Sequence, residues 1–302
     1  MSIEVQNISK YYQEQLALDK INFKVNSGEI VGFLGPNGAG KSTTMKIISC
    51  FIKPSNGEVL VDGDSIHRNE IRVKSKIGYL PENNPLYEEM YVRESIGFIA
   101  QMHQVKNWKT AVENVIEKVG LHKEAHKKIG QLSKGYQQRV GIAQAIVHDP
   151  KVLILDEPTS GLDPNQLNEI RLLIKELGKN KTVMLSTHIM QEVESICDRI
   201  VVINNGKIVA DQNLEEKTNF KDFPREQVLL VEFDQELKIN ALKKSFPKTK
   251  IDQKDHFWIF SHMGKDDLRK TISKYAQKNN ILILEMKAHN DKLEDLFKKL
   301  TK

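Results

Sequence analysis

Three short apolar runs divide the first two thirds of the chain, at residues 30–34 (IVGFL), 151–158 (KVLILDEP) and 183–188 (VMLSTH). Each run is bounded by glycine or by polar residues and has the length of a buried strand. Segments 92–103 and 110–120 instead space their apolar residues with a helical period. Continuous apolar strands that alternate with helices are typical of a parallel sheet covered on both faces, so the pattern predicts an α/β core.

A second pattern begins after about residue 220. Strand-like and helix-like segments alternate in the order βαββαβ, at 228–233, 235–246, 249–253, 256–261, 266–279 and 281–286. This order resembles a ferredoxin-like α+β domain, and an amphipathic helix is expected to close it near 291–300. Because 302 residues exceed the usual size of one hydrophobic core, we predict two domains, 1–220 and 221–302.

The composition is that of a soluble globular protein, with 39% hydrophobic and 28% charged residues. No apolar stretch approaches the roughly 18 residues of a membrane span, and the first ten residues lack the pattern of a signal peptide. Cys50 and Cys197 are the only cysteines and have no metal-ligand spacing. A reduced, cytosolic protein with two buried thiols is therefore expected.

The net charge of +5 lies entirely in the second predicted domain, which carries 18 Lys and Arg against 13 Asp and Glu. Such a modest surplus is typical of a solvated face, and aromatic residues do not alternate with the basic ones. We therefore expect no nucleic-acid partner. Weak attraction to anionic lipid headgroups stays open.

The first apolar run leads directly into GPNGAGKST at 35–43, followed by helix-prone TMKIISCFI at 44–52. A strand, a glycine-rich turn and a helix form a phosphate-binding loop, in which successive amides and the helix N-terminus face the phosphates. Lys41 would reach the β- and γ-phosphates, and the hydroxyl of Ser42 would join a magnesium shell. The residues expected to bind nucleotide here are Gly35, Pro36, Asn37, Gly38, Ala39, Gly40, Lys41, Ser42 and Thr43.

The other two apolar runs end in residues that fit phosphate hydrolysis. Asp156 is a candidate magnesium ligand, and the next residue, Glu157, suits a general base that polarises a water. His188 ends the third run, and the carboxyl ends of parallel strands face the ligand in such sheets. The alternatives are a surface acid at a strand end and an ordinary hydrogen-bonded histidine.

A second turn that opens a helix occurs at 132–140, LSKGYQQRV. One loop is enough for one nucleotide, so two such turns must serve two nucleotides or meet from different chains. With GPNGAGKST, LSKGYQQRV, ILDEPTSGLD and STH in this order, residues 1–220 closely resemble the ATP-hydrolysing subunit of an ATP-binding cassette (ABC) transporter.

The resemblance implies a P-loop fold with a mixed sheet, ATP and Mg²⁺ as ligands, and catalytic roles for Lys41, Glu157 and His188. It implies that Ser133 and Gly135 cap the γ-phosphate held by a second cassette subunit, with a homodimer expected. It also implies an integral-membrane permease as partner and a peripheral location at the cytoplasmic face of the membrane. The alternative to phosphate binding by Ser133 is that it only caps the N-terminus of its own helix.

The resemblance also implies roles for a few single positions of this sequence. Tyr12 matches the aromatic residue that stacks on adenine, although Tyr11 beside it is an alternative. Asp163, in SGLD at 160–163, resembles an acid at the dimer contact, and Ser160 is a second candidate for that contact. Glu82 stands where the family's lid residue is usually glutamine, so a metal-ligand role is retained and a water-orienting role is in doubt.

Lys134 and Tyr136 depart from the commonest signature, LSGGQ, in the manner of cassettes that export drugs, polysaccharides or lipids. The overall resemblance is nearest to cassettes of bacterial gliding-motility and related exporters. Residues 65–131 are expected to be mainly helical, with a helical subdomain at about 88–150 facing the membrane partner. The alternative function is a non-transport cassette ATPase of translation or DNA repair. The single cassette and the absence of a long heptad run argue against it, and Glu157 argues against a regulator that does not hydrolyse.

Overall fold

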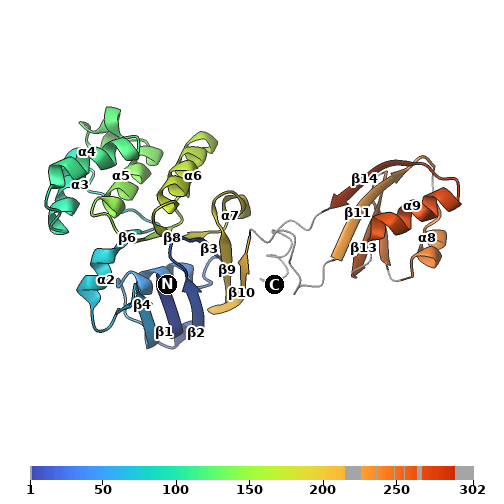
Figure 1. Cartoon of the computed structure of the whole chain (residues 1–302), viewed down its shortest axis with the longest axis horizontal. Helices are drawn as coiled ribbons and strands as arrows, with labels where there is room; N and C mark the ends of the chain where they lie inside the picture. The colour runs from blue at the N-terminus through green and yellow to red at the C-terminus, as the bar shows by residue number, and fades with distance from the viewer. Residues whose placement is uncertain are drawn as a thin grey trace. The chain divides into compact units, whose positions relative to one another are not determined.

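The computed structural model describes residues 2–214 and 226–289, apart from 236, 248, 255 and 264–266. The chain divides into two compact units near residue 215 (Figure 1). The predicted boundary at 220/221 and the helix predicted near 291–300 lie outside the described residues, so both stay predictions.

The first unit is built on a six-stranded sheet in the order β10-β9-β3-β8-β7-β6. These strands span Lys207–Asn213, Arg199–Asn204, Ile30–Leu34, Thr182–Thr187, Val152–Asp156 and Ile77–Leu80. Five of them run parallel, and β10 pairs antiparallel to β9 at one edge. The three strands predicted from the apolar runs are confirmed as β3, β7 and β8, and all three are buried at every residue.

A second, antiparallel sheet packs against the first and was not predicted. Its order is β2-β1-β4-β5, with β1 at Ile3–Tyr12, β2 at Gln15–Val25, β4 at Asn56–Val61 and β5 at Asp64–Ser65. One core cluster joins the two sheets, and the rings of Phe23 (β2) and Phe33 (β3) lie 5.4 Å apart within it.

Seven α-helices occur in the described part of this unit: α1 (Lys41–Ile48), α2 (Glu70–Lys76), α3 (Val92–Met102), α4 (Trp108–Lys118), α5 (Lys134–Ile146), α6 (Pro164–Gly178) and α7 (Met190–Ile196). Short 3₁₀ turns lie at His122–Glu124 and Ile129–Gln131. Helices α3 and α4 match the predicted segments, and Figure 1 shows them grouped with α5 beyond the sheets. The expectation of a mainly helical stretch at 65–131 is wrong at 77–80, which forms the edge strand β6. Among the described residues, every helix falls short of the length and apolar character needed to cross a membrane.

The second unit follows the predicted βαββαβ order, with β11 (Glu226–Phe233), α8 (Ile239–Ser245), β12 (Thr249–Lys254), β13 (Phe257–Met263), α9 (Leu268–Lys278) and β14 (Ile283–His289). Its strands form an antiparallel sheet in the order β12-β13-β11-β14. Phe246, Trp258 and Phe260 belong to a separate core between this sheet and its helices. The ferredoxin-like assignment stays our interpretation of this order.

Candidate active site

The loop at 35–43 joins β3 to α1, as the strand, turn and helix pattern predicts. Two of its glycines are required by the backbone path. Gly40 has a left-handed φ of +109°, and a Cβ there would lie 2.6 Å from Cδ2 of Leu18. A Cβ on Gly35 would lie 2.4 Å from the carbonyl oxygen of Ile203. Both substitutions would force the loop away from the sheet, so the glycines fix the path of the phosphate-binding backbone.

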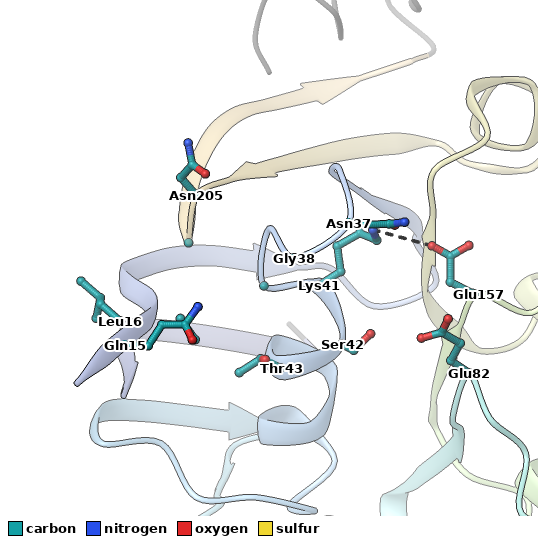
Figure 2. A pocket seen from close by; sticks show the side chains of 13 residues that line it. Gln15, Leu16, Asn37, Gly38, Lys41, Ser42, Thr43, Glu82, Glu157 and Asn205 are labelled. Carbon is teal, nitrogen blue, oxygen red and sulfur yellow. Dashed lines mark ion pairs between the residues drawn. The ribbon is translucent and has the colours of Figure 1, made fainter. Parts of the chain in front are cut away.

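A pocket of about 430 Å³ opens over this loop (Figure 2). The predicted residues that line it are Asn37, Gly38, Gly40, Lys41, Ser42, Thr43, Glu82 and Glu157. Gln15, Leu16, Ala17, Asn205 and Gly206 complete the lining and were not predicted. Figure 2 shows the carboxylates of Glu82 and Glu157 on one side of Lys41 and Ser42, and Gln15, Leu16 and Asn205 on the other. Gly35, Pro36 and Ala39 belong to the loop without lining the pocket.

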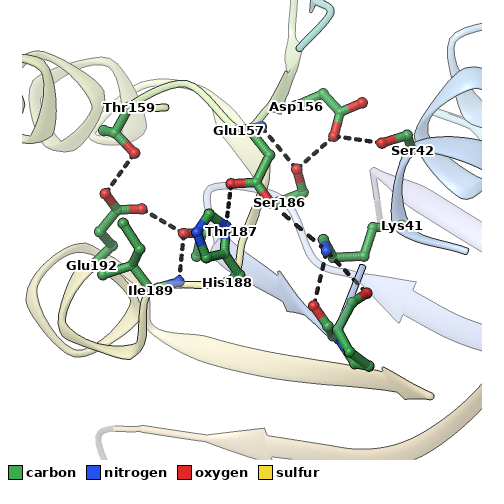
Figure 3. Close-up of polar contacts among 12 residues, drawn as sticks. Lys41, Ser42, Asp156, Glu157, Thr159, Ser186, Thr187, His188, Ile189 and Glu192 are labelled. Carbon is green, nitrogen blue, oxygen red and sulfur yellow. Dashed lines mark hydrogen bonds and ion pairs between the residues drawn. The ribbon is translucent and has the colours of Figure 1, made fainter. Parts of the chain in front are cut away.

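Lys41 is the first residue of α1, and its side chain is buried. Its ammonium group donates hydrogen bonds to the carbonyl oxygens of Gly35, at 2.8 Å, and Pro36, at 3.3 Å. The same nitrogen lies 3.7 Å from Oε1 of Glu157 (Figure 3). The ammonium group of Lys41 is therefore held against the start of the loop, beside the carboxylate of Glu157.

Asp156 ends β7 and is 1% exposed. Its Oδ1 accepts hydrogen bonds from the hydroxyl of Ser42, at 3.2 Å, and the hydroxyl of Ser186, at 2.6 Å (Figure 3). Ser186 is paired with Asp156 across the neighbouring strand β8. The two residues predicted to share a magnesium ion are thus adjacent, and β8 orients the carboxylate.

Glu157 has a left-handed φ of +49°, a conformation that is costly for a residue with a side chain. Its amide donates to the hydroxyl of Ser186 at 2.8 Å, and its Oε2 lies 2.9 Å from Nδ1 of His188. The Glu157 side chain is buried, whereas that of His188 is half exposed. The sharp turn after Asp156 sends the two successive carboxylates in different directions, as their separate predicted roles require.

Glu82 lies two residues beyond β6, and its side chain is exposed at the pocket. Tyr79, on β6, has a buried hydroxyl without a hydrogen-bond partner among the described residues. Burial, with the carboxylates of Asp156 and Glu82 nearby, raises the pKa of Tyr79 above its usual range. The pocket lining thus holds two acidic side chains, Glu82 and Glu157, whereas the buried Asp156 does not line it.

Ser133 and Gly135 open α5 and do not line the pocket of their own chain. Ser133 is exposed, and its side chain makes no capping hydrogen bond to the helix, unlike the plain N-cap considered from the sequence. Asp163, by contrast, is an N-cap, and its carboxylate accepts from the amides of Asn165 and Gln166 at 3.0 Å each.

Tyr12 ends β1 and is 46% exposed. It pairs with Gln15 across the hairpin, and Gln15, not Tyr12, lines the pocket. The stacking of Tyr12 on adenine therefore stays a prediction.

Two polar residues of this region were missed from the sequence. Ser186 touches both acids, and its signal was a serine inside the apolar run VMLSTH. Glu192, on α7, is fully buried and accepts from the hydroxyls of Thr159 and Thr187 (Figure 3). Its partners Thr159 and Thr187 lie in the two motifs ILDEPTSGLD and STH, but Glu192 itself lies outside every motif recognised in the sequence.

Comparison with known proteins agrees with this geometry. The family model described as ABC transporter matches residues 18–160. The bacitracin transport ATP-binding protein BcrA of Bacillus licheniformis is 34% identical over 99% of this chain and 96% of its own length. The lantibiotic transport ATP-binding protein SrtF of Streptococcus pyogenes is 34% identical over 75% of this chain and 97% of its own length.

Solved structures show the same fold. The ATP-binding subunit of an ABC transporter superposes with a TM-score of 0.66 at 30% identity, covering 72% of this chain and 91% of its own. A dimeric ATP-binding cassette in a post-hydrolysis state bound to ADP and Pi superposes with a TM-score of 0.65 at 28% identity, covering 70% and 98%. The chain therefore belongs to the ABC transporter family, as the ATP-binding and ATP-hydrolysing subunit that powers transport.

Proposed function

We propose that the chain hydrolyses ATP with Glu157 as general base and His188 as the residue that orients it. The observation that carries this proposal is the placement of Glu157 between Nδ1 of His188, at 2.9 Å, and the ammonium group of Lys41, at 3.7 Å. With Nδ1 protonated, His188 donates to one carboxylate oxygen and leaves the other facing the phosphate loop. A water near Glu157 could then be polarised for in-line attack on the γ-phosphate.

The pocket supplies oxygen donors that suit Mg²⁺. The hydroxyl of Ser42 and the carboxylate of Asp156 are hydrogen-bonded to each other, and Glu82 lines the same pocket. No group of three or more His, Cys, Asp or Glu in the described part of the chain is arranged to hold a metal by itself. Mg²⁺ keeps several waters and takes phosphate oxygens as ligands, so it needs few protein ligands. When bound, the ion would neutralise charge that develops on the phosphate oxygens.

We further propose a head-to-tail homodimer with two ATP molecules in its interface. Ser133 carries an exposed hydroxyl that does not cap its own helix, and it lies outside the pocket of its own chain. The amide of Gly135 and the N-terminus of α5 would add to an anion cap. The dimeric cassette bound to ADP and Pi supports such an arrangement.

The membrane side of the proposal rests on the relatives. Proteins named for bacitracin and lantibiotic transport support a peripheral location at the cytoplasmic face of a membrane, with a separate permease as partner. They favour export over import, and peptide antibiotics as the first substrates to test. The likeness to BcrA extends over 99% of the chain, so it includes the second unit.

We assign residues 1–220 to the cassette and 221–302 to an accessory domain without a part in the chemistry. The described residues of the second unit form their own core. A chain truncated near residue 221 should bind ATP but should change in dimer affinity or in its coupling to the permease.

Magnesium-dependent release of phosphate from ATP by the purified protein tests the proposal. We expect turnover with Mg²⁺, none with excess chelator, and a Lys41→Ala variant that neither binds nor hydrolyses ATP. Hydrolysis that persists without divalent cations would contradict it. For export, deletion of the gene in its host should raise sensitivity to bacitracin, and restoration by the wild type but not by Lys41→Ala is the supporting result.

A further inference from the structure

Glu157 and His188 are the first residues after the ends of the neighbouring strands β7 and β8. Backbone pairing between β7 and β8 ends at Asp156 and Ser186. Glu157 and His188 lie beyond that pair, so the ladder that aligns the two strands does not itself fix their separation.

Side chains continue the link where the ladder stops. The amide of Glu157 donates to the hydroxyl of Ser186. One step further from the sheet, Glu192 bridges the two segments, since its Oε1 accepts from the hydroxyl of Thr159 at 2.5 Å and its Oε2 accepts from the hydroxyl of Thr187 at 2.6 Å. Thr159 lies two residues after Glu157, and Thr187 comes directly before His188.

Glu192 is 0% exposed, so its carboxylate has no water contact to replace these bonds. The guanidinium of Arg171, on α6, lies 3.8 Å from its Oε1. The hydroxyl of Thr187 also accepts from the amide of Ile189 at 3.0 Å, which fixes the turn that carries His188. The bridge is therefore short and buried, and at its Thr187 end it is also hydrogen-bonded to the backbone (Figure 3).

We propose that Glu192 is a positioning residue for ATP hydrolysis, which acts by tying the segment after Glu157 to the segment before His188. The inference rests on the roles proposed for Glu157 and His188. Glu192 touches neither of them; it holds the two segments whose separation sets the contact between Oε2 of Glu157 and Nδ1 of His188. A purely structural Glu192 would stabilise α7 and leave catalysis per folded molecule unchanged.

Two near-isosteric variants test this. Thr159→Val removes one donor and keeps the shape of the side chain, whereas Glu192→Gln replaces one acceptor oxygen by an amino group. We expect each to lower kcat by about 10- to 100-fold with KM for ATP within about 2-fold of the wild type, because a small misplacement of reacting groups is costly in rate and not in binding. The double variant should lose little more than the worse single one, since both changes break one bridge.

The control is Thr182→Val, at the opposite end of β8. Thr182 is also buried, and its hydroxyl takes part in hydrogen bonds with Ser2 and with the amide of Gly28. Like Thr159→Val, the Thr182→Val substitution replaces a buried hydroxyl by a methyl group. Thr182 lies at the end of β8 that is far from Glu157 and His188. We expect the folded Thr182→Val protein to have the wild-type kcat. The unfolding midpoint of each protein is measured as well, so that kcat is compared per folded molecule.

The outcomes separate the two proposals. If Glu157→Gln is inactive while folded Thr159→Val and Glu192→Gln keep the wild-type kcat, the positioning role is wrong and the proposed function stands. If the two variants lose no more kcat than Thr182→Val, Glu192 is structural only. If Glu157→Gln keeps its turnover, the proposed base is wrong and this inference falls with it.

Discussion

Nδ1 of His188 lies 2.9 Å from Oε2 of Glu157, although the two residues follow different strands of the sheet. With a proton on Nδ1, the imidazole donates to this oxygen and restricts the rotation of the carboxylate. The pair can therefore present one oxygen of Glu157 to the pocket while the other is held.

Replacing His188 by alanine should lower kcat by about 10²- to 10³-fold, because it removes the partner that orients the proposed base. Binding of ATP should be retained, since the phosphate loop is unchanged. Steady-state hydrolysis and equilibrium binding of a fluorescent ATP analogue measure the two effects. The matched control is His122→Ala, at an exposed histidine of the 3₁₀ turn His122–Glu124. A His188→Ala protein with the wild-type kcat would contradict the proposed role of His188 in orienting Glu157.

Replacing Glu82 by glutamine should raise the Mg²⁺ concentration for half-maximal ATPase activity by about 2- to 10-fold, because the pocket loses one negative charge near the proposed cation site. The maximal rate should change less than this. A titration of activity with Mg²⁺ checks the shift, with Glu117→Gln on the exposed face of α4 as control. An unchanged titration would remove Glu82 from the cation site.

The Glu157→Gln protein should dimerise with ATP and dissociate with ADP, as followed by sedimentation velocity. Adding Ser133→Ala should raise the dimer dissociation constant by at least about 10-fold, because a hydrogen bond to a charged phosphate is lost at each of the two sites. The exposed serine of α2 supplies the control Ser75→Ala. A monomer at saturating ATP would count against the homodimer.

His148 gives a prediction on stability and pH. Its ring stacks on His103 at 3.7 Å, and burial, together with His103, lowers the pKa of His148 to about 4. The unfolded chain binds a proton at this histidine below about pH 6.5, whereas the folded chain does so only near pH 4. The folded state therefore loses about 1–3 kcal/mol from this residue as the pH falls from 7 to 4.5.

Urea unfolding at pH 7 and pH 4.5 measures this loss. A His148→Phe variant keeps an aromatic ring beside His103 without the titrating group. Its free energy of unfolding should fall less over the same interval, and an equal fall in both proteins would show that His148 does not contribute.

The strands and the loop that carry the site can be predicted from the sequence, because each is marked by a local run of apolar residues or of glycines. The buried strands β3, β7 and β8 were visible as apolar runs, and the loop at 35–43 followed from the glycines that its path requires. The antiparallel sheet of β1, β2 and β4 was missed because its register shifts interrupt the period-2 alternation. Strand β6 was missed because it has only four residues and forms between helical segments.

The hydrogen bonds that support Asp156, Glu157 and His188 could not be predicted from the sequence, for a different reason. Ser186, Thr159 and Glu192 act through partners that the fold brings together from separate segments, 30 and 33 residues apart. The left-handed backbone at Glu157 is likewise invisible, because glutamate does not favour it. Such features are held by tertiary packing and leave no local pattern.

The role of Glu157 in hydrolysis is tested most directly by the Glu157→Gln protein, measured for ATP binding and for single-turnover hydrolysis in the same preparation. Glutamine keeps the shape of the side chain and cannot take a proton from water. We expect ATP affinity within a few-fold of the wild type and hydrolysis lowered by about 10²-fold or more. Turnover at the wild-type rate in that protein would contradict the role of Glu157 and, with it, the proposed mechanism.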